Sequence, residues 1–74
     1  MTNRINVIGS NQTEIKQSNG TIIFYSYNTP VVALFDGKWY KTNKKWSNTT
    51  SKHINKYLDG INALETDQSF FDNL

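Results

Sequence analysis

The dipeptide Asp36-Gly37 separates two short runs rich in strand-forming residues, residues 31–35 and residues 38–42. Asp-Gly favours the positive φ angles of a two-residue type I′ turn, whose twist matches that of two antiparallel strands. The sequence therefore predicts an antiparallel hairpin over residues 31–42. The middle of this 74-residue chain is expected to lie in a sheet.

Counting outward from that turn assigns the side chains of the hairpin to its two faces. One face carries Val32, Leu34, Trp39 and Lys41, and the other carries Val31, Ala33, Phe35, Lys38, Tyr40 and Thr42. Whichever face is buried, an aromatic ring and a lysine are expected to share the exposed one. The alternative is that a helix covers one face and that the exposed ring only packs against its cross-strand neighbours.

A second hairpin is predicted where Asn-Gly occupies positions 19–20, between residues 13–18 and residues 21–27. Asn-Gly is also a signal for a two-residue type I′ turn. With that turn, Ile15 lies opposite Phe24, and we expect the face that carries both residues to point inward.

Several Ser and Thr residues precede a helical pattern in the second half of the chain. Their hydroxyl oxygens can accept hydrogen bonds from the free N–H groups of a first helical turn. The apolar residues beyond them follow the helical spacing i, i+3, i+4 and i+7. We expect a helix from about Thr50 to Asp59, with Gly60 either ending it or lying inside a longer helix. The N-cap candidates are Ser47, Thr49, Thr50 and Ser51, and the apolar stripe is Ile54, Tyr57, Leu58, Ile61 and Leu64.

Together these elements predict an α+β fold, an antiparallel β-meander of four to five strands with one C-terminal helix packed on a face. Residues 5–8 form the first strand, which Gly9 ends. Pro30 lacks an N–H donor and favours a turn before the central hairpin. The stripe of the helix is expected to cover one face of the sheet.

The last residues of the chain mix acids with phenylalanines. We expect a single α+β domain over residues 1–65 and an acidic, aromatic C-terminal tail over residues 66–74. Phe70 or Phe71 is expected to dock on the sheet or on a second copy of the chain. A sheet of this size also leaves strand edges open, so a monomer or a homodimer is expected.

The composition argues against several classes of chemistry. The chain has no cysteine and a single histidine, so we expect no disulfide, no metal site and no cofactor. Its acids are scattered or lie in the tail, so we expect no catalytic residue and no enzyme. The N-terminus lacks a signal-peptide pattern, and no apolar run approaches the roughly 20 residues of a membrane span. A cytoplasmic protein with no membrane partner is expected.

Charge is segregated along the chain, although the net charge is only +2. Residues 1–37 sum to zero, residues 38–57 carry six lysines and no acid, and residues 58–74 carry four acids. The basic segment also holds four aromatic residues. A local basic patch attracts polyanions that the average charge would not. Residues 38–57 are therefore the expected functional segment.

Lysines that contact phosphates beside rings that stack on bases are typical of single-stranded nucleic-acid binding. The same residue types also have simpler explanations, because two lysines on a helix are commonly a solvated face and a lone histidine is commonly a surface or capping residue. Lysine acts as a point charge, which predicts little sequence preference. The candidate binding residues are Lys38, Trp39, Tyr40, Lys41, Lys44, Lys45, Trp46, Lys52, His53 and Lys56.

Residues 25–58 contain, in order, a Thr-Pro turn, a strand pair around a glycine turn, and the run Thr-Thr-Ser-Lys-His-Ile-Asn at the start of the helix. This order resembles a small uncharacterised domain that recurs in tailed-bacteriophage proteins. The resemblance covers just under half of the chain. It implies an early phage protein that redirects host processes in the cytoplasm of the host cell, and it supplies no site residues.

Two functions are therefore expected. The first is binding of single-stranded nucleic acid, with RNA favoured, through the basic and aromatic surface. The alternative is a protein-binding inhibitor or modulator of a host enzyme that uses the same rings as anchors, since Trp and Tyr are enriched in interface hot spots. Salt dependence distinguishes the two, because binding through phosphates weakens steeply as salt is added.

Overall fold

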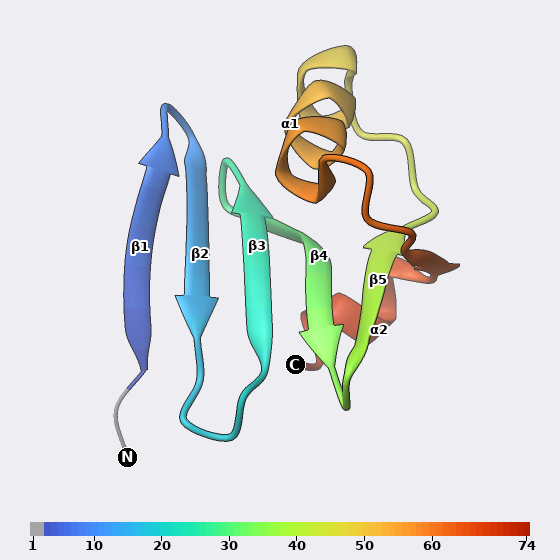
Figure 1. Cartoon of the computed structure of the whole chain (residues 1–74). Helices are drawn as coiled ribbons and strands as arrows, with labels where there is room; N and C mark the ends of the chain where they lie inside the picture. Colours follow the sequence, from blue (N-terminus) through green and yellow to red (C-terminus); the bar gives the residue numbers. More distant parts are fainter. Residues whose placement is uncertain (1–2) are drawn as a thin grey trace.

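The computed structural model describes residues 3–74, which form one six-stranded sheet and two helices (Figure 1). Strands β1 to β5 pair antiparallel with their neighbours in the chain, as the predicted meander requires, and β6 pairs with β5 in parallel. The prediction of four to five strands and one helix therefore omitted β6 and α2. The elements are β1 (Arg4–Gly9), β2 (Gln12–Lys16), β3 (Ile22–Ser26), β4 (Thr29–Phe35), β5 (Lys38–Thr42), α1 (Asn48–Leu58), β6 (Leu64–Thr66) and α2 (Gln68–Asp72).

The β4–β5 hairpin has the predicted register, in which Leu34 pairs with Trp39 next to the turn. Asp36 and Gly37 have positive φ angles of 53° and 77°. Positive φ at both central residues is the mark of a type I′ turn. The central hairpin of the sequence analysis is confirmed.

The β2–β3 hairpin differs from the prediction by one residue. The N–H of Gln17 donates to the carbonyl of Thr21 at 2.8 Å, so the loop has three residues instead of two. Ile15 consequently pairs with Ile23, and Glu14 takes the place opposite Phe24. Because side chains alternate between faces, this shift puts Glu14 on the face that carries Phe24. The predicted pairing of Ile15 with Phe24 is wrong.

Helix α1 packs on the face of the sheet that carries Phe24. The core cluster consists of Phe24, Val31, Val32, Ile54 and Leu58, and Tyr57 stacks on Phe24 with ring centroids 4.1 Å apart. The helix begins after Ser47, whose Oγ accepts a hydrogen bond from the N–H of Thr50, and it ends before Asp59 and Gly60, which both have positive φ. Ile61 lies beyond this end and is 41% exposed, so it does not extend the buried stripe.

Helix α2 packs on the opposite face. Tyr40 neighbours Trp39 in β5 and so points away from α1. The ring centroid of Phe70 lies 4.9 Å from that of Tyr40 and 5.9 Å from that of Phe35. Phe71 is buried. A phenylalanine of the tail therefore docks on the sheet, as predicted, although it does so through a second helix that was not predicted.

Strand β6 runs beside β5 and pairs Leu64 with Tyr40 and Thr66 with Thr42. Parallel neighbours need a long crossover connection, which here contains α1. Three residues without apolar alternation give no strand signal, which explains why the sequence analysis missed β6. Neither helix within residues 3–74 has the length and hydropathy needed to span a membrane.

Candidate functional site

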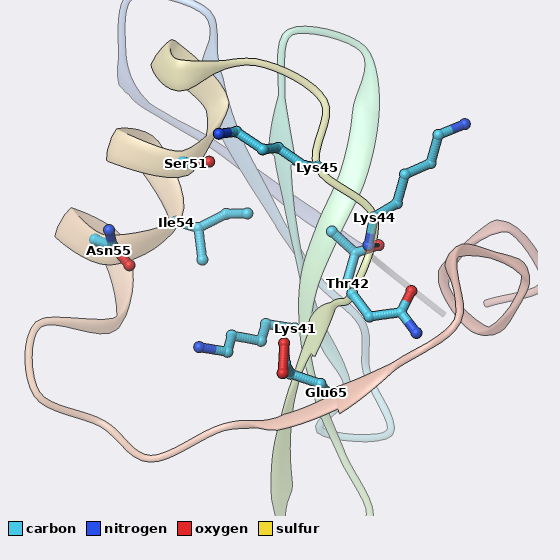
Figure 2. Close-up of a pocket in the computed structure, with 9 residues that line it drawn as sticks. Lys41, Thr42, Lys44, Lys45, Ser51, Ile54, Asn55 and Glu65 are labelled. Carbon is cyan, nitrogen blue, oxygen red and sulfur yellow. Dashed lines mark hydrogen bonds between the residues drawn. The ribbon is translucent and has the colours of Figure 1, made fainter.

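Three lysines of the basic segment line an open hollow of about 310 Å³ at the end of β5, and Figure 2 shows the side chain of Lys44 pointing away from those of Lys41 and Lys45. Lys41 lies in β5, and Lys44 and Lys45 lie in the connection from β5 to α1. Ser51, Ile54 and Asn55 of α1 and Glu65 of β6 also line the hollow. A concave surface with clustered positive charge favours an anionic ligand.

Thr42 sets the direction of the chain as it leaves β5 toward this hollow. Its buried hydroxyl accepts a hydrogen bond of 3.2 Å from the N–H of Lys44 and donates one of 2.8 Å to Oε1 of Gln68. The N–H of Asn43 donates to the carbonyl of Thr66 at 2.9 Å. These contacts fix the backbone from which Lys44 and Lys45 project.

Trp46 remains accessible next to the lysines. Its side chain is 43% exposed, and its indole N–H donates a hydrogen bond of 3.0 Å to Oε1 of Gln68. The Nζ of Lys44 lies 4.0 Å from the centroid of the indole ring, which is a cation–π contact. The ring is thus held in place at its edge while part of its surface stays open.

Gln68 connects this region to α2, and the sequence analysis did not identify it. Its Oε1 accepts from the hydroxyl of Thr42 and the indole of Trp46. Its Nε2 donates to the carbonyl of Pro30 at 2.7 Å and to Oδ1 of Asp72 at 3.2 Å. All four hydrogen-bonding positions of the amide are used. Most of the partners of Gln68 are distant in sequence, so no local sequence pattern indicates its role.

The other two candidate rings, Trp39 and Tyr40, are partly buried. Trp39 packs edge-on against Tyr57 of α1 with centroids 6.0 Å apart, and Tyr40 packs against Phe70 of α2. Both faces of the hairpin are thus covered at these positions. The expected combination of an exposed ring with a lysine is kept only near the turn, where Phe35 is 40% exposed beside Lys38.

The candidates on α1 lie apart from the hollow. Lys52 and Lys56 are exposed, and Lys56 lines a different hollow near β1. The Nδ1 of His53 lies 2.8 Å from the Oγ of Ser26, which is buried. Ser26 Oγ also lies 3.1 Å from Oγ1 of Thr50, so these side chains join α1 to β3. His53 therefore has a structural partner in the sheet.

The structure brings four of the ten candidates together and leaves the rest elsewhere. The group at the hollow is Lys41, Lys44, Lys45 and Trp46. The candidates outside this group are Lys38, Trp39, Tyr40, Lys52, His53 and Lys56.

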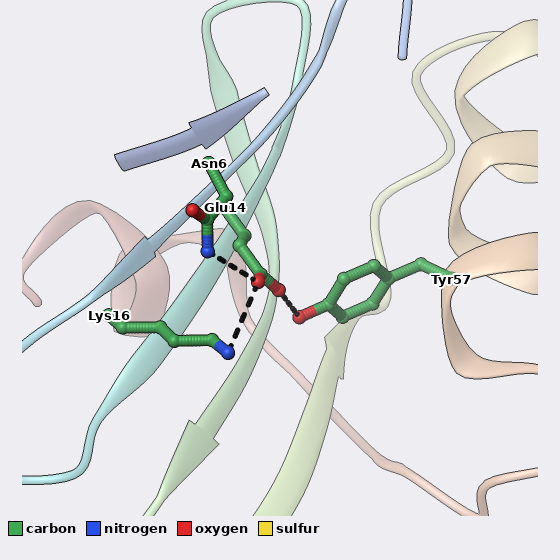
Figure 3. A network of polar contacts seen from close by, with 4 residues as sticks. All are labelled: Asn6, Glu14, Lys16 and Tyr57. Atoms are coloured by element: carbon green, nitrogen blue, oxygen red, sulfur yellow. Dashed lines mark hydrogen bonds and ion pairs between the residues drawn. The ribbon is translucent and has the colours of Figure 1, made fainter. Parts of the chain in front are cut away.

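A polar network at the other end of the sheet ties α1 to the first two strands (Figure 3). The hydroxyl of Tyr57 donates to Oε2 of Glu14 at 2.6 Å, and Oε1 of Glu14 lies 3.1 Å from Nδ2 of Asn6 and 3.6 Å from Nζ of Lys16. Burial raises the pKa of Glu14, but the hydrogen bonds from Tyr57 and Asn6 and the charge of Lys16 outweigh it and hold that pKa below its ordinary value. Burial, followed by the hydrogen bond to Glu14 and its charge, raises the pKa of Tyr57. Each member has a partner inside the network, so we assign it a structural role.

Within residues 3–74, no three side chains of His, Asp or Glu lie close enough together to hold a metal ion. No curated protein and no solved structure matches the chain. A family model does match, and it covers residues 1–73. The chain therefore belongs to the family of unknown function DUF8033.

Proposed function

We propose that this protein binds single-stranded nucleic acid, with RNA favoured, through Lys41, Lys44, Lys45 and Trp46. The observation that carries the proposal is that three lysines line one hollow, and that one of them, Lys44, lies over the ring of an accessible tryptophan, Trp46. Cationic grooves with aromatic stacking surfaces are the common means of binding single strands.

The lysines supply affinity without much sequence preference. Each lysine that meets a phosphate releases a counterion, so log K falls with log salt by about 0.7 per contact on a single strand. Three contacts predict a slope of about −2. Trp46 adds stacking, which contributes roughly 1–3 kcal/mol per base. Trp39 and Tyr40 are packed against the helices, so the proposal uses one stacking ring.

The proposed biological setting is that of a small phage-encoded protein that modulates its host in the host cytoplasm. It is supported by the resemblance of residues 25–58 to a domain of tailed-bacteriophage proteins. A protein of this kind that holds single-stranded RNA at a basic hollow would act on host or phage transcripts without chemistry of its own.

A protein partner is the second candidate, and an exposed sheet face favours it. Ile5 and Val7 in the edge strand β1 are 67% and 78% exposed, on the side of the sheet opposite α1. Ile5 also lines a hollow with Ile15 and Tyr25. Exposed apolar residues next to an open strand edge are typical of protein contacts. This surface differs from the aromatic surface that the sequence indicated for such a partner.

The proposal is tested by NMR titration of labelled protein with a short mixed-sequence RNA and with the matching single-stranded DNA, at two salt concentrations. Signals of residues 41–46 should shift and should return toward their free positions as salt is raised. A variant with Lys41, Lys44 and Lys45 changed to Gln should lose most of the affinity.

The matched control changes Lys38, Lys52 and Lys56 to Gln, which removes the same charge outside the hollow. This control should retain most of the affinity. Equal losses in both variants would show that binding follows overall charge and that the hollow is not the site. An absence of shifts at low salt would end the nucleic-acid proposal and direct the search to a protein partner at the β1 face.

A further inference from the structure

One carboxylate lies among the lysines of the hollow. Glu65 in β6 pairs in register with Lys41 in β5, so the two side chains leave the sheet on the same face. Glu65 is exposed and lines the hollow together with the three lysines, as Figure 2 shows. Among residues 3–74, Lys16 and Glu14 form the single ion pair, so no lysine of the hollow is within ion-pair distance of Glu65.

This carboxylate is unfavourable in a site that takes phosphate alone. An ionised carboxylate offers only acceptors, and it repels a phosphate placed next to it. The other polar residues that line the hollow are neutral: Thr42, Asn43, Ser51 and Asn55. The arrangement therefore suits a ligand that presents negative oxygens to Lys41, Lys44 and Lys45 and an N–H or O–H donor to Glu65.

A single strand of RNA has both kinds of group in each nucleotide. Its phosphates match the lysines, and its ribose 2′-hydroxyl is a donor that DNA lacks. Base amino groups are donors as well, but RNA and DNA share them. Lys44 borders the hollow and also lies over the ring of Trp46, so neighbouring nucleotides can occupy the hollow and the indole.

We propose that Glu65 accepts a hydrogen bond from a ribose 2′-hydroxyl and thereby makes the hollow prefer RNA to DNA. This inference rests on the proposed binding of single-stranded nucleic acid, and it names Glu65 as the residue that distinguishes RNA from DNA. The lysines contribute to both nucleic acids alike, because phosphates are common to both. In a complex with DNA, which lacks the 2′-hydroxyl, Glu65 only repels the phosphates and so weakens binding. In a complex with RNA, the hydrogen bond from the 2′-hydroxyl to Glu65 offsets that repulsion.

The test compares dissociation constants for a short RNA and for a DNA of the same sequence, with uracil in both, by fluorescence anisotropy. The wild type should prefer RNA by about fivefold to tenfold, the range that one hydrogen bond supports. Glu65→Gln removes the charge but keeps an acceptor oxygen, and Glu65→Ala removes both. Both variants should bind DNA more tightly, and the preference for RNA should shrink in Glu65→Gln and vanish in Glu65→Ala.

Asp36→Asn is the matched control. It also removes one negative charge, and it preserves the type I′ turn because Asn-Gly favours the same positive φ angles. This variant should keep the wild-type preference. A preference that is unchanged in Glu65→Ala would overturn the inference while leaving the proposed binding intact. A wild type that binds neither strand would overturn both.

Discussion

The hydroxyl of Tyr57 in α1 donates a hydrogen bond of 2.6 Å to Glu14 in β2, across 43 positions of sequence. The apolar residues of α1 contact β3 and β4, through Phe24 and Val32. The hydrogen bond from Tyr57 to Glu14 connects the helix to β2, and the hydrogen bond from Asn6 to the same carboxylate connects β1 to this contact. The β1–β2 edge of the sheet is thus held to the helix by polar groups.

Tyr57→Phe is expected to lower the free energy of unfolding by about 1.5 kcal/mol, because the lost hydrogen bond has a charged acceptor. The phenyl ring still stacks on Phe24, so the core keeps its packing. Urea unfolding measures the change. Tyr40→Phe is the control, since Tyr40 packs through its ring against Phe70. Equal effects of the two substitutions would contradict the role given to the Tyr57 hydroxyl.

The network also predicts how stability depends on pH. The pKa of Glu14 is lower in the folded state than its ordinary value of 4.5, so the unfolded chain binds this proton more readily. The stabilisation is fully present above the ordinary pKa and is lost as pH falls through the folded value. Melting temperatures of wild type and Glu14→Gln should therefore differ most near neutral pH and converge as the pH falls well below the ordinary pKa of 4.5. A constant difference across this range would be evidence against a lowered pKa.

At alkaline pH the stabilisation from the hydrogen bond between Tyr57 and Glu14 falls as the pH rises, which is the opposite of its dependence in acid. The pKa of Tyr57 is raised by burial and by Glu14, so its stabilising effect is present below the ordinary pKa of 10.0 and is lost as pH rises above it. Ultraviolet absorbance should show a late ionisation step, that of Tyr57, above the ordinary tyrosine pKa of 10.0. In Glu14→Gln this late step should move to lower pH, and a step that stayed in place would contradict the assignment.

The sequence located both hairpins but determined the register of only one. Asp-Gly and Asn-Gly mark turns equally well, yet Gly20 with φ of 93° closes a three-residue loop and Gly37 closes a two-residue turn. Loop length is decided by packing on the strands and is not visible in the turn residues alone. The difference of one residue moved Glu14 from the expected outer face to a position under Tyr57.

The site was predictable in charge and less so in shape. The excess of lysine in residues 38–57 indicated a basic surface, and Lys41, Lys44 and Lys45 do gather at one hollow. The partial burial of Tyr40 depends on α2, which lies far along the chain. Glu65 likewise enters the site only because β6 adds to β5. Contacts of this kind follow from the tertiary fold, which local patterns do not encode.

Gln68→Ala should destabilise the protein by about 2 kcal/mol, because several partly buried groups lose their partner at once. The loss should also release Trp46, whose indole N–H is held by Gln68. Thermal unfolding measures the first effect, and the emission of Trp46 in a Trp39→Phe background measures the second. Asn62→Ala removes an exposed amide and should change stability by less than about 0.5 kcal/mol. A stable Gln68→Ala protein would show that the amide is not a structural link.

Ile54→Asp should cost several kcal/mol, since it removes an apolar side chain from the core between α1 and the sheet and puts a carboxylate there. Asn55→Asp introduces the same group at the neighbouring exposed position and should cost far less. Circular dichroism during heating distinguishes the two. If both variants melt at the same temperature, α1 does not pack on the sheet through Ile54.

The two tryptophans allow stacking on the proposed ligand to be assigned to one ring. Trp39 is partly buried against Tyr57, whereas Trp46 is 43% exposed beside Lys44. The fluorescence of Trp39→Phe comes from Trp46 alone. In this variant most of the quenching by RNA that is seen in the wild type should remain. In Trp46→Phe, whose fluorescence reports Trp39, RNA should quench little. Trp46→Ala should weaken RNA binding by roughly 1–3 kcal/mol, the contribution of one stacked base. Quenching confined to Trp39 would contradict the role given to Trp46.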